Sequence, residues 1–260
     1  MAELNGEQRR RYGRQIDLPG VVEAGQRKLA AARVLVVGAG GLGSPVIYYL
    51  AAAGVGTLGI ADSDNVDLSN LQRQILHDTA GVGTHKTASA AARVMALNPD
   101  VNVIRFAQRI TADNVSAVAR DYDLAVDCTD NFPIRYLLND ACVALGMPMV
   151  HGSVFEFEGQ ASTFIPGQGP CYRCLFSEAP PEELSGGPGP MIFGPSPGLI
   201  GLIQAAETLK IILETGDTLA GRLLLVDLLK MRFKELAVKR DPACPACGHS
   251  PGVERFGRHD

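Results

Sequence analysis

Short apolar runs alternate with longer, alanine-rich segments through the first half of the chain. The runs consist of Val, Ile, Leu and Ala almost without polar interruption, which is typical of strands buried on both faces of a parallel sheet. The strand–helix alternation predicts an α/β fold with a Rossmann-like, doubly wound sheet. The expected strands are 33–37, 57–61, 101–106 and 122–127, and the expected helices are 44–54, 86–97, 112–120 and 132–145.

The pattern changes near residue 148, where strand-like runs follow one another without a helix between them. Such runs favour antiparallel pairing, so we expect a mixed sheet at the C-terminal end of the fold. A short turn around Glu158 and Gly159 is expected between the first two. A stretch rich in proline and glycine, 178–198, predicts a long loop. The expected elements are strands at 149–153, 160–165, 222–228 and 231–236 and a helix at 199–213.

No internal repeat and no clear linker interrupts the pattern, so we expect one continuous domain over residues 1–260. The polar residues before the first strand predict amphipathic helix. The expected parts are an N-terminal helical region 1–32, a strand–helix half 33–147, a second half 148–248 and a tail 249–260.

Composition excludes several classes of function. Apolar residues make up 46% of the chain, enough to fill a sizeable core. The net charge of −4 provides no broad basic field, so a nucleic-acid partner is not expected. No apolar run is expected to reach the ~18 residues that span a bilayer, and the polar N-terminus lacks the core of a signal peptide. We therefore expect a cytoplasmic protein without membrane contact, whose thiols stay reduced.

Four of the six cysteines form two Cys-x-x-Cys pairs in the second half. Each pair aims two thiolates at one ion, and two pairs fit a tetrahedral zinc with four sulfur ligands. Such a zinc has no open coordination position, so we expect a structural role that joins the chain on either side of the long loop. The expected zinc ligands are Cys171, Cys174, Cys244 and Cys247.

The other cysteines and the histidine beside the second pair have different expected roles. Cys128 follows a strand and Cys142 lies in a helical run, so both are expected to be small core residues. His249 lies next to the second pair but is not expected to bind the metal.

A glycine-rich loop with Gly38, Gly40, Gly41 and Gly43 follows the first strand and opens a helix. The glycines permit a tight turn and close approach of the backbone to a phosphate, and the helix N-terminus directs amide hydrogens at the anion. Asp62 ends the next strand, where a carboxylate typically holds ribose hydroxyls. The loop predicts a bound nucleotide, NAD or ATP, and a tight turn without a ligand is the alternative.

Two cations beyond the second strand favour ATP over NAD. Ser69 or Asn70 could cap a short helix that presents Arg73, and Lys86 follows further along. Cations near the glycine loop can neutralise the α-phosphate and the departing pyrophosphate of a nucleoside triphosphate. From the residues alone, the alternative that Arg73 and Lys86 are solvated surface charges stays open.

A polar segment, 127–131, stands at the carboxyl end of the fourth expected strand, where ligands of open α/β sheets gather. Asp130 could hold magnesium against the phosphates, because that ion prefers carboxylates and water. Alternatively, Asp130 or Asn131 caps the helix that follows, and the two roles are compatible.

Together these motifs resemble the ubiquitin-activating superfamily, and most closely its bacterial branch, the MoeB/ThiF/HesA adenylyltransferases. The resemblance runs from about Tyr12 to Gly248, nearly the whole chain. The joint occurrence of these motifs is far more specific for this family than the glycine loop alone. The resemblance rests on the glycine loop 38–43, Asp62, the segment 69–74, Lys86 and the segment 127–131.

The resemblance implies a defined chemistry. A ubiquitin-like (β-grasp) sulfur-carrier protein offers its C-terminal Gly-Gly carboxylate, which attacks the α-phosphate of ATP–magnesium and expels pyrophosphate. The product is a carrier acyl-adenylate, ready to accept sulfur for molybdopterin, thiamine or related biosynthesis. The sulfur would come from a separate donor, a cysteine desulfurase or a rhodanese. By the same likeness, 33–147 is the nucleotide-binding half and 148–248 the carrier-binding half with its zinc clasp.

The resemblance also assigns roles to residues. Asp62 would hold the ribose, and Asp130 would hold magnesium. Asn70, Arg73 and Lys86 would hold the phosphates. The implied nucleotide-binding residues are Gly38, Gly40, Gly41, Gly43, Asp62, Asp64, Ser69, Asn70, Arg73, Gln74, Lys86, Thr129, Asp130 and Asn131.

Arg14 matches a family arginine that reaches the phosphates from the partner subunit. This implies a homodimer with composite sites; without the resemblance, Arg14 would be one of many arginines on a polar helix. The implied catalytic residues are Arg14, Arg73, Lys86 and Asp130.

The long loop departs from the family pattern. In many relatives, a cysteine ahead of the Gly-Pro that corresponds to Gly194 and Pro195 links covalently to the carrier. Gly187 stands at that position here, and glycine cannot act as a nucleophile. We hypothesise adenylation alone, without a covalent carrier–enzyme thiol intermediate, and expect the loop to cover the carrier's extended tail.

Three alternatives remain beside adenylation of a sulfur carrier. The same fold could activate another carboxylate, on a peptide or a tRNA base. An NAD(P)-dependent oxidoreductase would explain the glycine loop and Asp62 but would leave Arg73, Lys86 and Asp130 without a role. A zinc-stapled, nucleotide-sensing scaffold without catalysis has no positive support beyond the same residues.

Overall fold

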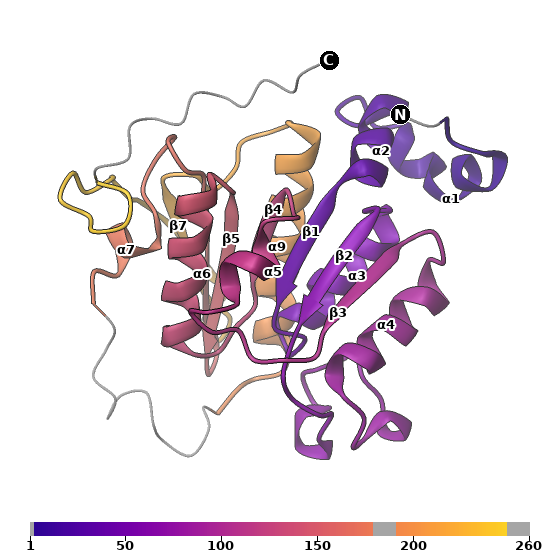
Figure 1. Ribbon diagram of the computed structural model, residues 1–260, viewed down its shortest axis with the longest axis horizontal. Helices are drawn as coiled ribbons and strands as arrows, with labels where there is room; N and C mark the ends of the chain where they lie inside the picture. The colour runs from indigo at the N-terminus through magenta and orange to yellow at the C-terminus, as the bar shows by residue number, and fades with distance from the viewer. Residues whose placement is uncertain (1–2, 179–190, 249–260) are drawn as a thin grey trace.

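The computed structural model describes residues 3–178 and 191–248, in which helices cover both faces of a central sheet (Figure 1). The strands are β1 Arg33–Val37, β2 Thr57–Ala61, β3 Asn102–Phe106, β4 Leu124–Asp127, β5 Met149–Phe155, β6 Glu158–Phe164, β7 Arg222–Asp227 and β8 Arg232–Ala237. The α-helices are α1 Gly6–Ile16, α2 Val22–Ala31, α3 Gly43–Ala53, α4 Lys86–Leu97, α5 Val115–Ala119, α6 Phe132–Leu145, α7 Tyr172–Leu175 and α9 Pro195–Leu213, and the 3-10 helices are η1 Leu68–Asn70 and η2 Thr79–Gly81.

The eight strands form one sheet in the order β3-β2-β1-β4-β5-β6-β7-β8. The first five of these run parallel, and β6, β7 and β8 continue the sheet antiparallel. The predicted α/β fold, a doubly wound sheet with mixed C-terminal strands, is confirmed. The chain passes from β1 outward to β2 and β3 and then returns to β4. The sheet therefore switches direction between β1 and β4, which is where open α/β sheets bind their ligands.

Alternate residues of β1 enter two hydrophobic cores, one on each face of the sheet. Val34 and Val36 lie in the core formed with α3 and α9. Leu35 and Val37 lie in the core formed with α5 and α6. Because both faces are covered, the four positions after Arg33 are apolar and buried, and each side chain fully buried in this way contributes about 1.5–3 kcal/mol.

The polar N-terminal region forms two helices. Asn5 caps α1: its side chain accepts hydrogen bonds from the first turn, and the Gln8 side chain accepts one in return from the Asn5 N–H. The break at 17–21 contains Pro19 and Gly20, both of which disfavour a continuous helix. Helix was therefore predicted correctly for this region, but the break within it was not.

The turn between β5 and β6 lies two residues earlier than expected. Glu156 and Phe157 separate the two strands, and Glu158 and Gly159 belong to β6. Glu156 has a φ of 50°, in the left-handed region. Tight hairpin turns require positive φ, and glycine is the usual signal for it. The prediction placed the turn at Gly159 and was wrong because a glutamate takes this conformation instead.

The prediction of loop up to residue 198 was also wrong at its C-terminal end. α9 begins at Pro195, so two prolines and Gly198 lie in its first turn. Proline suits that turn because the missing N–H would have had no helical partner and its fixed φ is already helical. The segment 179–190 of the expected loop, which includes Gly187, and the tail from His249 onward lie outside the described residues.

α9 is long and apolar enough, by length and composition alone, to cross a membrane, which qualifies the expectation that no segment could do so. In the fold it is a core helix that packs against α3, β5 and β6. Its buried Gln204 donates to the backbone oxygen of Asp127. Its buried Glu207 accepts hydrogen bonds from Thr163 and from the backbone of Leu219. Burial within the protein accounts for the apolar character of this helix.

Candidate functional site

A cavity of about 680 Å³ opens at the carboxyl ends of β1, β2 and β4, at the switch point of the sheet. Its size lies within the ~300–1,000 Å³ typical of small-molecule sites. Residues from the loops after β1, β2, β3 and β4 line it, together with the N-terminal ends of α4 and α9. The lining residues that the sequence had singled out are Gly40, Gly41, Asp62, Asp64, Ser69, Arg73, Gln74, Lys86, Thr129, Asp130 and Asn131.

The four glycines of the loop divide into two roles. Gly40 and Gly41 line the cavity. Gly38 has a φ of 100°, and a Cβ there would lie 2.5 Å from the carbonyl oxygen of Cys128. A Cβ on Gly43 would lie 2.0 Å from the carbonyl oxygen of Gly38. Gly38 and Gly43 therefore permit the tight turn, which brings the N-terminus of α3 to the cavity.

Gly43→Ala should disrupt this turn, because the added Cβ meets rigid backbone. We expect ATP affinity to fall by about tenfold or more and stability to fall by about 1–3 kcal/mol. Calorimetric titration with ATP and thermal unfolding measure the two effects. Gly6→Ala is the matched control, because a Cβ at Gly6 meets nothing within 4 Å. Unchanged ATP affinity in Gly43→Ala would contradict the role of the turn.

The Asp62 carboxylate ties two loops of the cavity together. One oxygen accepts a hydrogen bond from the Ala39 N–H at 2.8 Å, and the other accepts from the Asp64 N–H at 2.8 Å. Each carboxylate oxygen can accept a second hydrogen bond. Asp62 can therefore shape the glycine loop and still receive the hydroxyls of a ribose.

Lys86 lies almost inside the protein, with 7% of its side chain exposed. Its Nζ donates to Oδ2 of Asp64 at 2.9 Å, and this hydrogen bond holds the pKa of the Asp64 carboxyl below its usual value. A solvated surface charge would not be buried in this way, so that alternative is wrong for Lys86. Arg73 is half-buried and also lines the cavity, with Nη1 3.4 Å from the Ser69 carbonyl oxygen. The two cations thus border the same cavity.

The short helix before Arg73 is η1, and its cap differs from the prediction. Asp67 accepts hydrogen bonds from the Ser69 N–H and hydroxyl, so the cap is neither Ser69 nor Asn70. Oδ1 of Asn70 accepts from Nε2 of the buried Gln74 at 3.1 Å. Asn70 is not among the residues that line the cavity, but it contacts Gln74, which is.

The turn after β4 presents Asp130 to the cavity. Thr129 anchors the turn through its N–H and hydroxyl, both of which donate to Oδ1 of Asp127. Asn131 caps α6 by accepting from the Ile134 N–H. Asn131, and not Asp130, is therefore the cap, and the exposed Asp130 is one of the residues that line the cavity. An exposed carboxylate is a ligand that magnesium accepts, and the role of Asp130 as a magnesium ligand stays a prediction.

Two further residues of the site had no recognisable sequence signal. The ring of His77 bridges the Ala39 carbonyl oxygen, at 2.8 Å from Nε2, and the Ser89 hydroxyl, at 2.9 Å from Nδ1. Burial lowers the pKa of His77, so a neutral ring braces the glycine loop. Arg135 is 6% exposed, lines the cavity and donates to the Thr129 carbonyl oxygen at 2.9 Å.

Arg14 does not reach the cavity of its own chain. Helix α1 packs at the opposite, amino-terminal edge of the parallel strands (Figure 1). Asn98, at the end of α4, donates to the Tyr12 hydroxyl there, and the Tyr12 ring abuts Gly54 at the far end of α3. The length of α3 alone, about 16 Å, separates this edge from the glycine loop. A role of Arg14 at the nucleotide stays a prediction and requires a second chain.

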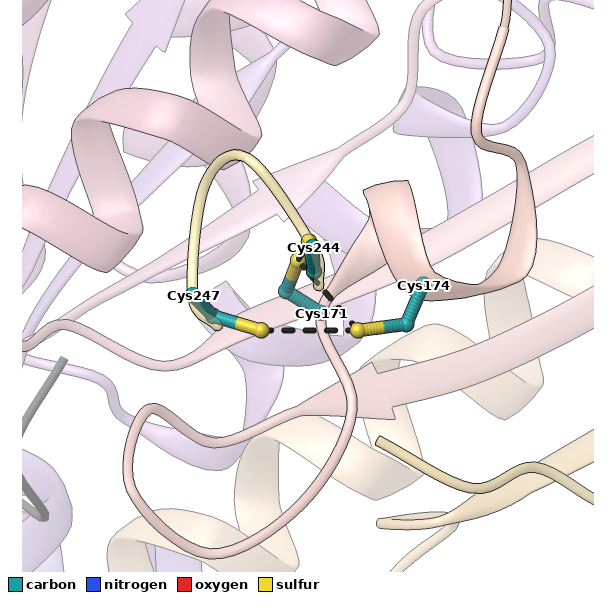
Figure 2. A group of neighbouring side chains, drawn as sticks. All are labelled: Cys171, Cys174, Cys244 and Cys247. Atoms are coloured by element: carbon teal, nitrogen blue, oxygen red, sulfur yellow. Dashed lines mark hydrogen bonds between the residues drawn. The ribbon is translucent and has the colours of Figure 1, made fainter. Parts of the chain in front are cut away.

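Figure 2 shows the four predicted zinc ligands pointing toward one another from two separate segments. The sulfur atoms of Cys171, Cys174, Cys244 and Cys247 all lie within 4.8 Å of one another. The Sγ–Sγ distances are 4.0 Å within the first pair and 3.6 and 3.4 Å between the pairs. A tetrahedron with Zn–S bonds of ~2.3 Å has edges of about 3.8 Å. The cluster therefore fits zinc, and it joins α7 to the segment after β8.

The two remaining cysteines are core residues, as predicted. Cys128 and Cys142 are 6% and 2% exposed. Burial raises the pKa of both thiols, Cys128 well above its usual value, so neither is poised as a thiolate.

The ThiF family model matches residues 12–246. The chain belongs to the ThiF family. Membership in the ThiF family confirms the resemblance inferred from the motifs, and the matched range includes the glycine loop, both candidate phosphate cations and three of the four clustered cysteines.

Named relatives share close to half of the sequence of this ThiF-family chain. The SAMP-activating enzyme E1 of Haloferax volcanii is 49% identical over 252 residues, 96% of this chain and 93% of the relative. The sulfur carrier protein adenylyltransferase of Thermus thermophilus is 48% identical over 253 residues, 93% of this chain and 91% of the relative. The adenylyltransferase and sulfurtransferase MOCS3 of Bos taurus is 46% identical, but the match covers 56% of its length.

Solved structures share the fold at lower identity. E. coli MccB crystallised with ATP superposes with a TM-score of 0.82 at 23% identity, covering 92% of this chain and 74% of that chain. This ThiF-family chain therefore has the same backbone architecture as an ATP-binding protein.

Proposed function

We propose that this chain adenylates the C-terminal Gly-Gly carboxylate of a ubiquitin-like sulfur-carrier protein, with ATP as the other substrate and pyrophosphate as a product. The observation that carries the proposal is the convergence of Arg73, Lys86 and Asp130 on one cavity that Gly40 and Gly41 of the glycine-rich loop also line. The names of the relatives from Haloferax volcanii, Thermus thermophilus and Bos taurus support the same reaction class.

The cavity residues would perform the reaction by position and charge. Asp62 would hold the ribose, and the N-terminus of α3 would receive a phosphate. Arg73 and Lys86 would neutralise the phosphates while the carrier's carboxylate, itself an anion, approaches the α-phosphorus. Their charge would also stabilise pyrophosphate as it leaves. Asp130 and water would hold magnesium, which supplies further charge neutralisation when bound.

The carrier's tail would enter from the second half of the chain. Val154, Ile192 and Pro197 line the cavity beside the glycine loop. The segment that leads to Pro197 is fixed there, because Glu156 pairs with 191–193 and Gly194 abuts the Gln72 carbonyl oxygen. Exposed apolar side chains near this approach could receive the carrier's body. They are Phe155, Phe157, Met191, Phe193, Leu229, Met231 and Phe233.

The proposal extends to the domain organisation, the oligomeric state, the compartment, the zinc and the sulfur donor. The continuous sheet supports one domain formed from a nucleotide-binding and a carrier-binding half. Helix α1, which carries Arg14, lies at the edge of the sheet opposite the cavity (Figure 1), so a role of Arg14 at the nucleotide would require a homodimer with composite sites. We place the reaction in the cytoplasm, with zinc in the cysteine cluster and with a separate sulfur donor, a cysteine desulfurase or a rhodanese.

The alternatives account for less of the site. An NAD(P)-dependent oxidoreductase has no use for a buried Lys86 beside Asp64 or for Asp130 at the cavity. Activation of a tRNA base would use the same residues, but the net charge of −4 favours no nucleic-acid partner. Activation of a peptide carboxylate would also use the same residues; the names of the relatives at 49% and 48% identity favour a sulfur carrier instead.

ATP–pyrophosphate exchange tests the proposal. The chain is mixed with ATP, magnesium, labelled pyrophosphate and a ubiquitin-like carrier that ends in Gly-Gly. We expect exchange with the intact carrier and none with the same carrier lacking its two final glycines. Non-reducing electrophoresis of the reaction should show no thiol-linked adduct, since the six cysteines lie in the cluster or the core. Hydride transfer from a nicotinamide without exchange on any carrier would overturn the proposal.

A further inference from the structure

A buried Asp–His pair that the proposed reaction does not use lies at the end of β4, immediately before the cavity-lining residues Cys128 and Thr129. Asp127 ends β4, and His151 is its register partner in the neighbouring strand β5. Both side chains are 0% exposed, and Nδ1 of His151 lies 2.7 Å from Oδ2 of Asp127. A carboxylate removed from water in this way requires a partner that donates a hydrogen bond.

The chemistry of the pair fixes which atom donates. The hydrogen bond from His151 keeps the pKa of Asp127 lowered even though burial acts to raise it. Burial lowers the pKa of His151. The pair is therefore an anionic carboxylate and a neutral imidazole, with the ring proton on Nδ1, because an ionised carboxylate can only accept. The positive charge of Arg135 also lowers the pKa of both groups and so favours the same state.

The other oxygen of Asp127 holds the turn that carries Asp130. Oδ1 accepts from the Thr129 hydroxyl at 2.7 Å and from the Thr129 N–H at 3.1 Å. Arg135 donates to the carbonyl oxygen of the same residue. The chain of contacts therefore runs from His151 through Asp127 to Thr129, and the next residue is the exposed Asp130 at the cavity.

The surroundings of His151 indicate that the ring serves this contact. Tyr172 packs edge-on against it, with ring centroids 4.9 Å apart, and Phe164 lies 6.3 Å away. Among the described residues, Nε2 of His151 has no hydrogen-bond partner. An apolar side chain would fill the same aromatic pocket without leaving a buried nitrogen unpaired, so packing alone does not explain a histidine here.

We propose that His151 is a positioning residue: through Asp127 it sets the turn that directs Asp130 at the metal of a bound ATP–magnesium complex. The role rests on the proposed function in assigning magnesium to Asp130. His151 is fully buried and does not line the cavity, so it would act only through the carboxylate that it orients.

Equilibrium binding of ATP, with magnesium or with EDTA, tests this role without any carrier. The wild-type chain should bind ATP about tenfold or more tightly with magnesium. We call this increase in ATP affinity the magnesium gain. His151→Leu should lose most of the magnesium gain and leave the ATP affinity in EDTA within about twofold of wild type. His151→Asn should retain the gain within about threefold, because the amide nitrogen takes the place of Nδ1. A structural role alone would lower the unfolding temperature in both variants and leave the magnesium gain unchanged.

Two outcomes overturn the proposal: a full magnesium gain in His151→Leu, or a loss in His151→Asn equal to that in His151→Leu. Should His151→Leu fail to fold, Thr129→Val tests the contact between Asp127 and the turn. This variant removes one hydrogen-bond donor to Asp127 and leaves the Asp–His pair in place. It should reduce the magnesium gain, and an unchanged gain would again overturn the proposal. Absence of carrier-dependent exchange together with the expected binding pattern would remove the proposed function and leave the positioning role standing.

Discussion

Arg73→Ala and Asp130→Ala should each lower ATP–pyrophosphate exchange by about a thousandfold, the largest losses expected of any single substitution in this chain. Arg73 would neutralise charge on the phosphates, and Asp130 would hold the magnesium that does the same. Both interactions strengthen as negative charge moves onto the leaving pyrophosphate, so their removal acts on the transition state. The rate of exchange with a Gly-Gly-ended carrier at saturating ATP measures the effect.

Matched controls separate this loss from a general effect of removing charge. Arg120 and Asp113 are exposed and do not line the cavity, so Arg120→Ala and Asp113→Ala should exchange at close to the wild-type rate. All four variants should retain the metal of the cysteine cluster and unfold within a few degrees of wild type, because three of the side chains are exposed and Arg73 is only half-buried, and surface substitutions change stability by about 0.5 kcal/mol or less. Exchange within threefold of wild type in Arg73→Ala or Asp130→Ala would remove that residue from the mechanism.

The fold was predictable because its strongest signals are local. A parallel strand covered on both faces is apolar over nearly its whole length, so β1 and β2, each with a single polar residue at its start, appear in the sequence with the bounds they have in the structure. The cysteine cluster was predictable for a similar reason. The spacing within each pair fixes the geometry of a short turn, and the two turns need only meet.

The site was predictable where backbone geometry demands a particular residue. Gly38 and Gly43 have no tolerated substitute, because any Cβ would meet a carbonyl oxygen. The partners of charged groups were not predictable in this way. Lys86 reaches Asp64 because a backbone bridge between Asn65 and His85 brings the start of α4 beside the loop after β2. That contact forms only in the folded protein, so no periodic pattern in the sequence indicates it.

Side chains that brace the loops were missed for the same reason. A single histidine such as His77 has no motif, and its contact with Ala39 crosses from one loop to another. The cap of η1 was misplaced because Asp67, Ser69 and Asn70 are all good N-cap residues, and propensity does not rank them. The backbone selects Asp67, which precedes the first helical residue with extended φ and ψ.

Removing one ligand of the cysteine cluster should produce the largest loss of stability. Cys244→Ser should abolish binding of one zinc per chain and lower the free energy of unfolding by about 4 kcal/mol. This is less than the ~10–16 kcal/mol apparent for structural zinc in zinc-finger peptides, because most of the fold here has its own core. For a chain of this size the expected drop in unfolding temperature is about 10 °C. Elemental analysis and thermal unfolding measure the two effects.

Cys142→Ala is the matched control, since Cys142 is a buried cysteine outside the cluster. It should retain one zinc per chain.

The rate of ATP–pyrophosphate exchange then distinguishes a structural zinc site from a catalytic one. None of the four clustered cysteines lines the cavity, so Cys244→Ser should exchange within about tenfold of wild type below its unfolding temperature. A moderate loss is expected because Tyr172, beside Cys171, packs against His151. Complete loss of exchange in a folded Cys244→Ser chain would instead place the cluster in catalysis.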